Sequence, residues 1–240
     1  MINDHRPYLI KSWYIRLENW YANHFVSPQL AQLGSGYHLM KPWNISVHGS
    51  NIRIGKNIHV VATRDRKVAL STWTFKQHQG NIDIGDNCLL CPGVRIDSAS
   101  QVTIEDNCML AAGCYVTDAD WHDIYDRTEA VGTSKAVHLK NNVWIGDSAI
   151  ICKGVTIGAN SIIGAGAVVA GDIPENSIAA GNPAVVIKTL DPERALIKRE
   201  AIFQDQLALA HQIDQINRYA LGGNSLYGWL RNWMFPKRGD

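Results

Sequence analysis

The sequence has little net charge, few cysteines and no uninterrupted apolar segment near its start. Its 240 residues carry 23 Lys and Arg against 22 Asp and Glu, giving a net charge of +1. This balance argues against a general nucleic-acid binder, which needs a basic face to displace counterions. Five cysteines do not make a disulfide framework, and Lys11 interrupts the first apolar stretch, so we expect no export signal. Reduced thiols and a cytoplasmic location are therefore expected.

One longer stretch, Ser148–Ile173, is mostly apolar but contains Lys153, Asn160 and several glycines. Because these residues are poor partners for lipid, we predict no membrane-spanning segment. The hydrophobic share of 46% is ordinary for a folded protein, so most of the chain is expected to be ordered.

The apolar residues of the C-terminal half recur with a period of six. The first position of each hexad is Leu, Ile or Val: Leu139, Ile145, Ile151, Ile157, Ile163 and Val169. The fifth position is small or β-branched: Val143, Ala149, Val155, Ser161 and Ala167. A period of six differs from the 3.6 of a helix and the 2 of a simple strand. It is typical of short strands joined by turns, with one aliphatic side chain per hexad pointing inward.

The same frame is present upstream, with a slip of two residues in the middle. Its first positions are Ile84, Leu90, Ile96, Ile104, Leu110 and Val116, and its fifth positions are Cys88, Val94, Ser100, Cys108 and Cys114. A weaker start is visible at Ile54 and Val60. Three such strands close one triangular coil, and stacked coils form a solenoid with a ladder of aliphatic side chains inside.

The segments NVWIGD at 142–147, GVTIG at 154–158, IGAGAVV at 163–169, DIP at 172–174 and AGNPA at 180–184 resemble the hexapeptide-repeat acyltransferases. The resemblance covers about residues 45–190 and points to the branch with maltose, galactoside and polysaccharide-modifying O-acetyltransferases. It implies a mainly β fold, a left-handed parallel β-helix with helical additions at both ends. It also implies acetyl-CoA as cosubstrate and a homotrimer with active sites between subunits.

Three domains follow from this pattern. We expect an N-terminal helical segment at 1–41, the β-helix at 42–190 with a catalytic loop at 117–136, and a C-terminal amphipathic helix and tail at 191–240. Asp191 followed by proline predicts the start of that helix, and Gly222 with Gly223 predicts its end.

The loop at 117–136 is the largest break in the repeat after Ile84, and insertions of this kind often carry function. Val116 is the last ladder residue before it, and His122 occupies the next slot six residues on. A histidine can accept a proton near neutral pH. The resemblance implies that His122 is the general base. The candidates for orienting His122 or binding the acceptor are Asp118, Asp120, Trp121 and Arg127.

The resemblance also indicates cosubstrate contacts, at Trp144, Asp147, Ala165 and Lys188. Two positions depart from the sugar acetyltransferases, because Gly171 and Val185 stand where those enzymes often carry basic residues. The asparagine that binds substrate in the sugar branch is also missing, with Cys91 and the following Pro-Gly in its place. No metal site is expected, and Cys88 is predicted to pack in the core.

The expected activity is acetyl-CoA-dependent O-acetylation of a carbohydrate acceptor, a precursor of surface polysaccharide or glycolipid. N-acetylation of an amino sugar or amino acid is the enzymatic alternative. A non-catalytic β-helix scaffold, or a metal protein like the γ-class carbonic anhydrases, is an alternative of another class. The aromatic and basic tail from Leu226 suggests peripheral contact with the inner membrane face, and packing of the two chain ends against each other is its alternative.

Overall fold

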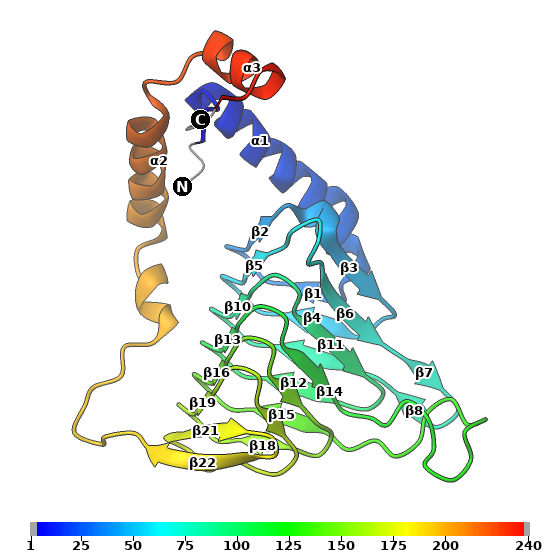
Figure 1. Cartoon of the computed structure of the whole chain (residues 1–240). Helices are drawn as coiled ribbons and strands as arrows, with labels where there is room; N and C mark the ends of the chain where they lie inside the picture. The colour runs from blue at the N-terminus through cyan, green and yellow to red at the C-terminus, as the bar shows by residue number, and fades with distance from the viewer. Residues whose placement is uncertain (1–3, 238–240) are drawn as a thin grey trace. The chain divides into compact units, whose positions relative to one another are not determined.

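The computed structural model describes residues 4–237, which divide into two compact units. One is Tyr21–Ala201, and the other combines the segments before and after it. The larger unit is a stack of triangular coils built from three sheets, which are parallel except for the antiparallel last strand of one of them (Figure 1). The coils wind as a left-handed parallel β-helix, which confirms the predicted fold class.

Each complete coil contributes one short strand to each sheet, and β21 and β22 extend sheet B beyond the other two. Sheet A holds β1 (Gln32–Leu33), β4 (Ile52–Ile54), β9 (Ile82–Ile84), β12 (Val102–Ile104), β15 (Val137–Leu139) and β18 (Thr156–Ile157). Sheet B holds β2 (His38–Met40), β5 (His59–Val61), β10 (Leu89–Leu90), β13 (Met109–Leu110), β16 (Trp144–Ile145), β19 (Ile162–Ile163), β21 (Ser177–Gly181) and β22 (Ala184–Thr189). Sheet C holds β3 (Ile45–His48), β6 (Val68–Thr72), β11 (Arg95–Ser98), β14 (Tyr115–Thr117), β17 (Ile150–Ile151) and β20 (Val168–Val169).

The aliphatic ladder predicted from the hexads is the core of this stack. Every predicted first-position residue from Ile84 to Val169 is buried, and Cys88 is buried as expected. Ser100 is the exception among the fifth positions, since it is only half-buried at a corner between sheets C and A. Burying one such aliphatic side chain stabilises a fold by about 1.5–3 kcal/mol, so repetition along the stack supplies most of the driving force.

Asparagines form the corner between sheets A and B. Six of them adopt left-handed backbone angles, with φ between 55° and 65°: Asn57, Asn87, Asn107, Asn142, Asn160 and Asn176. Asparagine tolerates this conformation better than most residues do. Their side-chain amides also bond along the stack, as from Asn160 Nδ2 to Asn176 Oδ1 at 2.8 Å. These asparagines thus both form the turn in each coil and connect successive coils by hydrogen bonds.

The solenoid begins earlier than the expected boundary at residue 42. β1 already pairs with β4, and β2 with β5, so strands begin at Gln32 inside the segment expected to be helical. The helical part consists of α1 (Tyr8–Tyr21), a π-helix at Ala22–Val26 and a 3₁₀ turn at Ser27–Gln29. Buried Ala22 and Val26 pack on the core. A second 3₁₀ turn, Pro42–Asn44, connects β2 to β3.

The prediction that a helix starts at Asp191 is wrong. The Asp191 carboxylate accepts a hydrogen bond from Glu193 N at 3.0 Å, but the chain continues without helix to the 3₁₀ turn Arg199–Phe203. The segment instead binds the asparagine corner. Arg199 Nε donates to Asn87 O at 2.8 Å, and Glu200 Oε2 accepts from Asn107 Nδ2 at 3.0 Å. These contacts between distant residues override the local helix-start signal.

In the smaller unit, α2 (Gln206–Leu221) is capped by the carboxylate of Asp205, and α3 is Leu226–Met234. The predicted helix end at Gly222 is confirmed. Tyr8 donates its hydroxyl to Asp214 at 2.5 Å, so the two chain ends pack together. In residues 4–237 no helix is long and apolar enough to cross a bilayer.

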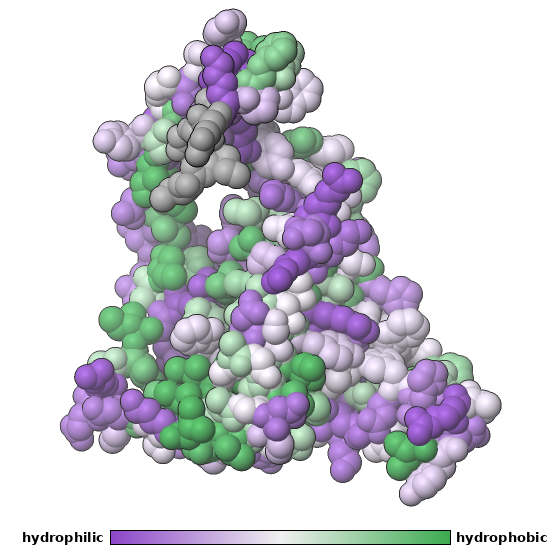
Figure 2. Space-filling view, in the orientation of Figure 1, coloured by the Kyte–Doolittle hydropathy of each residue, from purple (hydrophilic) through white to green (hydrophobic). Residues whose placement is uncertain are grey.

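The surface of the β-helix is unevenly apolar. Figure 2 shows hydrophobic residues gathered over the last coils, around β21 and β22. Val185, Val186 and Ile187 of β22 are all exposed there.

Candidate active site

Two segments project from the corner between sheets C and A. The hairpin of β7 (Thr74–Phe75) and β8 (His78–Gln79) connects β6 to β9, and residues 118–136 connect β14 to β15. Figure 1 shows both projecting on the same side of the coils. His78 Nδ1 lies 3.2 Å from Ser134 Oγ, and Lys76 forms an ion pair with Glu129. We call the two segments, residues 73–79 and 118–136, the paired arms.

An open pocket of about 500 Å³ lies at the base of the paired arms. It is lined by Trp73, Thr74, Phe75, Arg95, Asp97, Trp121, His122, Ala130 and Val131. His122 is exposed, and within residues 4–237 no hydrogen bond or ion pair engages its imidazole. The ring nitrogens are therefore open to a ligand in the pocket, as a general base requires.

Backbone hydrogen bonds between the two sides of the loop hold the main chain next to His122. Asp120 N donates to Thr133 O and Gly132 N donates to Asp120 O, both at 2.9 Å. A Cβ on Gly132 would lie only 2.6 Å from the carbonyl oxygen of His122. Glycine is therefore required for this close approach.

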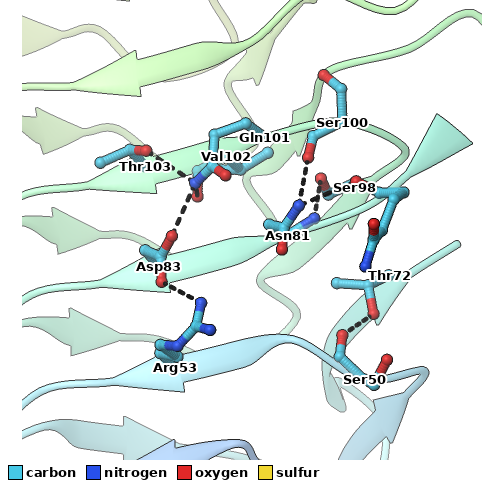
Figure 3. Close-up of polar contacts among 11 residues, drawn as sticks. Ser50, Arg53, Thr72, Asn81, Asp83, Ser98, Ser100, Gln101, Val102 and Thr103 are labelled. Atoms are coloured by element: carbon cyan, nitrogen blue, oxygen red, sulfur yellow. Dashed lines mark hydrogen bonds and ion pairs between the residues drawn. The ribbon is translucent and has the colours of Figure 1, made fainter.

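Asp118 does not orient His122, because it is fully buried and occupied elsewhere. Its carboxylate accepts hydrogen bonds from Ser98 Oγ at 2.7 Å, Ala99 N at 2.7 Å and Ser100 N at 2.8 Å. Asn81, where the hairpin returns to the coils, donates to Ser100 O at 3.1 Å (Figure 3). Asp118 thus fastens the corner beneath both arms.

The other charged candidates are also separate from the imidazole. Asp120 accepts two hydrogen bonds from Lys153 Nζ, at 2.6 and 2.5 Å, which ties the start of the loop to the coil below. Arg127 is exposed and does not line the pocket.

Trp121 is the predicted residue that joins His122 in the pocket. Its indole N–H lies 3.1 Å from both Tyr115 Oη and Thr117 Oγ1, on sheet C. Its ring lies 6.0 Å from that of Trp73, centroid to centroid, at an interplanar angle of 61°. This is ordinary geometry for an edge-to-face aromatic pair.

An ion pair between neighbours on β11 forms the polar side of the pocket. Arg95 Nη2 lies 2.5 Å from Asp97 Oδ2, and Ser71 Oγ donates to Asp97 Oδ1 at 2.5 Å. The guanidinium also lies over the Tyr115 ring, 4.7 Å from its centroid. The contact with the Asp97 carboxylate raises the pKa of Arg95, and burial raises the pKa of the Tyr115 phenol.

Sequence reasoning missed Trp73, Phe75, Arg95 and Asp97. A signal for the first two was present, because the interval from Leu70 to Ile84 breaks the period of six just as the later loop does. Arg95 and Asp97 occupy outward positions of a regular strand, where the repeat carries no functional signal.

The predicted cosubstrate residues lie away from this pocket. Trp144 is 45% exposed on sheet B, while Asp147 and Ala165 are exposed at the corner between sheets B and C. There Gly166 N donates to Asp147 O at 2.7 Å, which stacks the two turns. Lys188 is exposed on β22. One chain therefore does not bring these residues together with His122.

Across the described part of the chain, no group of three or more His, Cys, Asp or Glu side chains is placed to hold a metal ion.

Known proteins match the coils and the overall fold. Residues 136–171 match the bacterial transferase hexapeptide (six repeats) model, and residues 102–118 match the hexapeptide repeat of succinyl-transferase. Galactoside O-acetyltransferase of Escherichia coli K12 is 33% identical over 144 residues, 60% of this chain and 57% of that protein. A probable acetyltransferase of Mycobacterium tuberculosis is 29% identical over 75% of this chain and 57% of that protein. The chain thus spans little more than half the length of these relatives.

Two solved structures share the fold. A hexapeptide-repeat acetyltransferase from Vibrio cholerae, complexed with acetyl coenzyme A, has a TM-score of 0.51 at 23% identity, covering 73% of this chain and 79% of that one. The N-acyltransferase AntD from Bacillus cereus, in complex with dTDP and coenzyme A, has a TM-score of 0.56 at 19% identity, covering 81% and 96%. The repeat models thus show transferase-type hexapeptide repeats at 102–118 and 136–171, and the two solved structures show that the chain shares their fold.

Proposed function

We propose that this protein transfers the acetyl group of acetyl-CoA to a hydroxyl group of a carbohydrate, a precursor of surface polysaccharide or glycolipid. The observation that carries the proposal is an unengaged imidazole, His122, in an aromatic-lined pocket on the main loop of a hexapeptide β-helix. The names of two relatives support it, one a galactoside O-acetyltransferase and the other an acetyltransferase complexed with acetyl coenzyme A.

In the proposed reaction His122 takes the proton from the acceptor hydroxyl as its oxygen attacks the thioester carbonyl carbon. A carbon–oxygen bond forms, and the carbonyl oxygen becomes an oxyanion that needs a hydrogen-bond donor such as a backbone N–H. The intermediate collapses with cleavage of the carbon–sulfur bond, and the imidazolium returns its proton to the leaving thiolate. No group of the protein is acylated.

The cosubstrate would lie along the corner between sheets B and C. Exposed Trp144 offers an apolar surface to the pantetheine arm, and Asp147 and Ala165 border the same corner. Lys188 supplies a cation for the phosphates. A Cβ on Gly166 would meet no atom within 4 Å, so this corner is open. Since His122 lies at another corner, the complete site would combine two subunits of a homotrimer.

Replacement of the imidazole tests the proposed base. We expect His122→Ala to lower kcat by about 10²–10⁴-fold, the usual contribution of general-base catalysis, with the fold retained. Thiol release from acetyl-CoA, followed with a panel of carbohydrate acceptors, measures this rate. His211→Ala, a change at an exposed histidine of α2, is the matched control and should keep full activity. A His122→Ala protein with more than about a tenth of the wild-type rate contradicts the assignment.

The same assay separates the alternatives. Transfer to amino sugars or amino acids in place of hydroxyl acceptors would identify an N-acetyltransferase. No thiol release with any acceptor would favour a scaffold, and bound zinc in the purified protein would favour the γ-carbonic-anhydrase alternative.

A further inference from the structure

The paired arms create a binding surface that the repeat itself does not have. Trp73 and Phe75 come from the hairpin, and Trp121 comes from the loop beside His122. Trp73 and Phe75 are 46% and 40% exposed, so part of each ring is accessible to a ligand. The Lys76–Glu129 pair holds the two arms against each other.

Hydrogen bonds fix the orientation of both indoles. Trp73 Nε1 donates to Ser71 Oγ at 3.0 Å, and the Trp121 N–H is bonded to Tyr115 and Thr117. Each polar N–H is therefore satisfied by sheet C, and the remaining surface that the rings offer to the pocket is apolar. A rigid apolar aromatic surface suits the C–H face of a pyranose ring.

The pocket also has a polar side that is neutral overall. Asp97, whose side chain is only 5% exposed, compensates the charge of Arg95, whose side chain is 59% exposed. A guanidinium has five N–H donors in a fixed plane, more than the contact with Asp97 uses. Arg95 can therefore donate to sugar hydroxyls, while its paired carboxylate gives no net charge to attract an anionic sugar.

From these contacts we propose that the pocket is the acceptor site for a neutral pyranose, with its ring against Trp73 and Trp121 and its hydroxyls toward Arg95. This inference rests on the proposed function, which requires that the reacting hydroxyl of the pyranose point toward His122. It adds the substrate class and makes Trp73 and Arg95 specificity-determining residues.

Binding measured without acetyl-CoA tests the proposal independently of catalysis. The probes are methyl pyranosides of neutral hexoses and the corresponding uronates, followed by saturation-transfer NMR and by titration to obtain Kd. We expect the wild-type protein to bind at least one neutral pyranoside more tightly than its uronate. Trp73→Ala should weaken that binding roughly tenfold, and Trp73→Phe should restore most of it, because a ring face returns.

Two further variants keep the result interpretable. Phe75→Ala changes another exposed ring of the hairpin and should also weaken binding, whereas Trp233→Ala, at an exposed position of α3, should bind like the wild type. Circular dichroism checks the fold of each. In the transfer assay, Trp73→Ala should raise the KM for a carbohydrate acceptor and leave the KM for acetyl-CoA unchanged.

The proposal is overturned if no neutral pyranoside binds the wild-type protein, or if Trp73→Ala and Phe75→Ala both bind as the wild type does. Acetyl transfer to an amine or a non-sugar alcohol without pyranoside binding would refute it and leave acyl transfer intact. Pyranoside binding with an active His122→Ala variant would instead refute only the proposed base.

Discussion

At the scale of single residues, Gly132 has the clearest consequence for His122. A Cβ there would approach the His122 carbonyl oxygen at 2.6 Å and Asp123 Cα at 2.9 Å, both backbone atoms that cannot rotate away. The loop would have to shift, and with it the imidazole. A displacement of about 1 Å at a reacting group can cost on the order of 10² in rate.

We therefore expect Gly132→Ala to lower kcat on the order of 10²-fold while the KM for acetyl-CoA stays unchanged, as steady-state kinetics would show. The control is Gly223→Ala, since a Cβ on Gly223 meets no atom within 4 Å. Wild-type kcat in Gly132→Ala would mean that the position of the His122 backbone does not matter for the reaction.

Asp118 illustrates the limit of reading single residues from sequence. Its place in the loop, four residues before His122, made it a candidate for orienting the imidazole. Its side chain points into the coils and accepts hydrogen bonds from residues 98–100. A buried carboxylate needs several such donors, which this corner supplies to it. Sequence spacing gave its distance along the chain and not its direction.

At the scale of elements, the hairpin and the loop depend on each other. Lys76 and Glu129 are 52% and 41% exposed, so their ion pair adds little to global stability. Its effect is local, since it joins the hairpin that carries Trp73 to the loop that carries His122.

A charge exchange tests this coupling. Lys76→Glu or Glu129→Lys alone should raise the acceptor KM severalfold, because like charges then push the arms apart, with a change in Tm of only a few degrees. The double variant should recover most of the loss. Equal kcat/KM in all four proteins would show that the arms work separately.

The segment after the last coil shows why one helix prediction was wrong. Its local sequence has a good helix start at Asp191, yet Lys198 Nζ donates to Asn141 Oδ1 at 2.7 Å and Glu200 bonds Asn107. These contacts with the corner between sheets A and B take the place of helical hydrogen bonds, and helix α2 begins only after its cap residue Asp205.

At the scale of the whole molecule, the proposed function predicts a second subunit, because His122 and Trp144 lie at different corners of one chain. The exposed apolar residues of β22 are further surface that an assembly could bury. We expect light scattering to give three times the chain mass of 26.6 kDa.

Subunit mixing gives the sharper test. His122→Ala and Trp144→Ala chains should each be inactive alone. Co-expressed, they should recover activity at about a quarter of the sites, because each site then takes one residue from each of two neighbours. A monomeric mass, or no recovery on mixing, would contradict a shared site.

Contact of the C-terminal tail with a membrane stays a prediction.

The sequence by itself determined the β-helix, the aliphatic ladder and the place of the main loop. It could do so because every hexad makes the same contacts with its neighbours, and a repeated local environment selects the same residue types each time. Only the tertiary structure decided that the hairpin at 73–79 lies against the loop some fifty residues later, or that Arg95 and Asp97 form the polar side of the pocket. Those contacts depend on the stacking of successive coils, which places residues from separate coils side by side. The period of six does not show which of these outward-facing residues will meet.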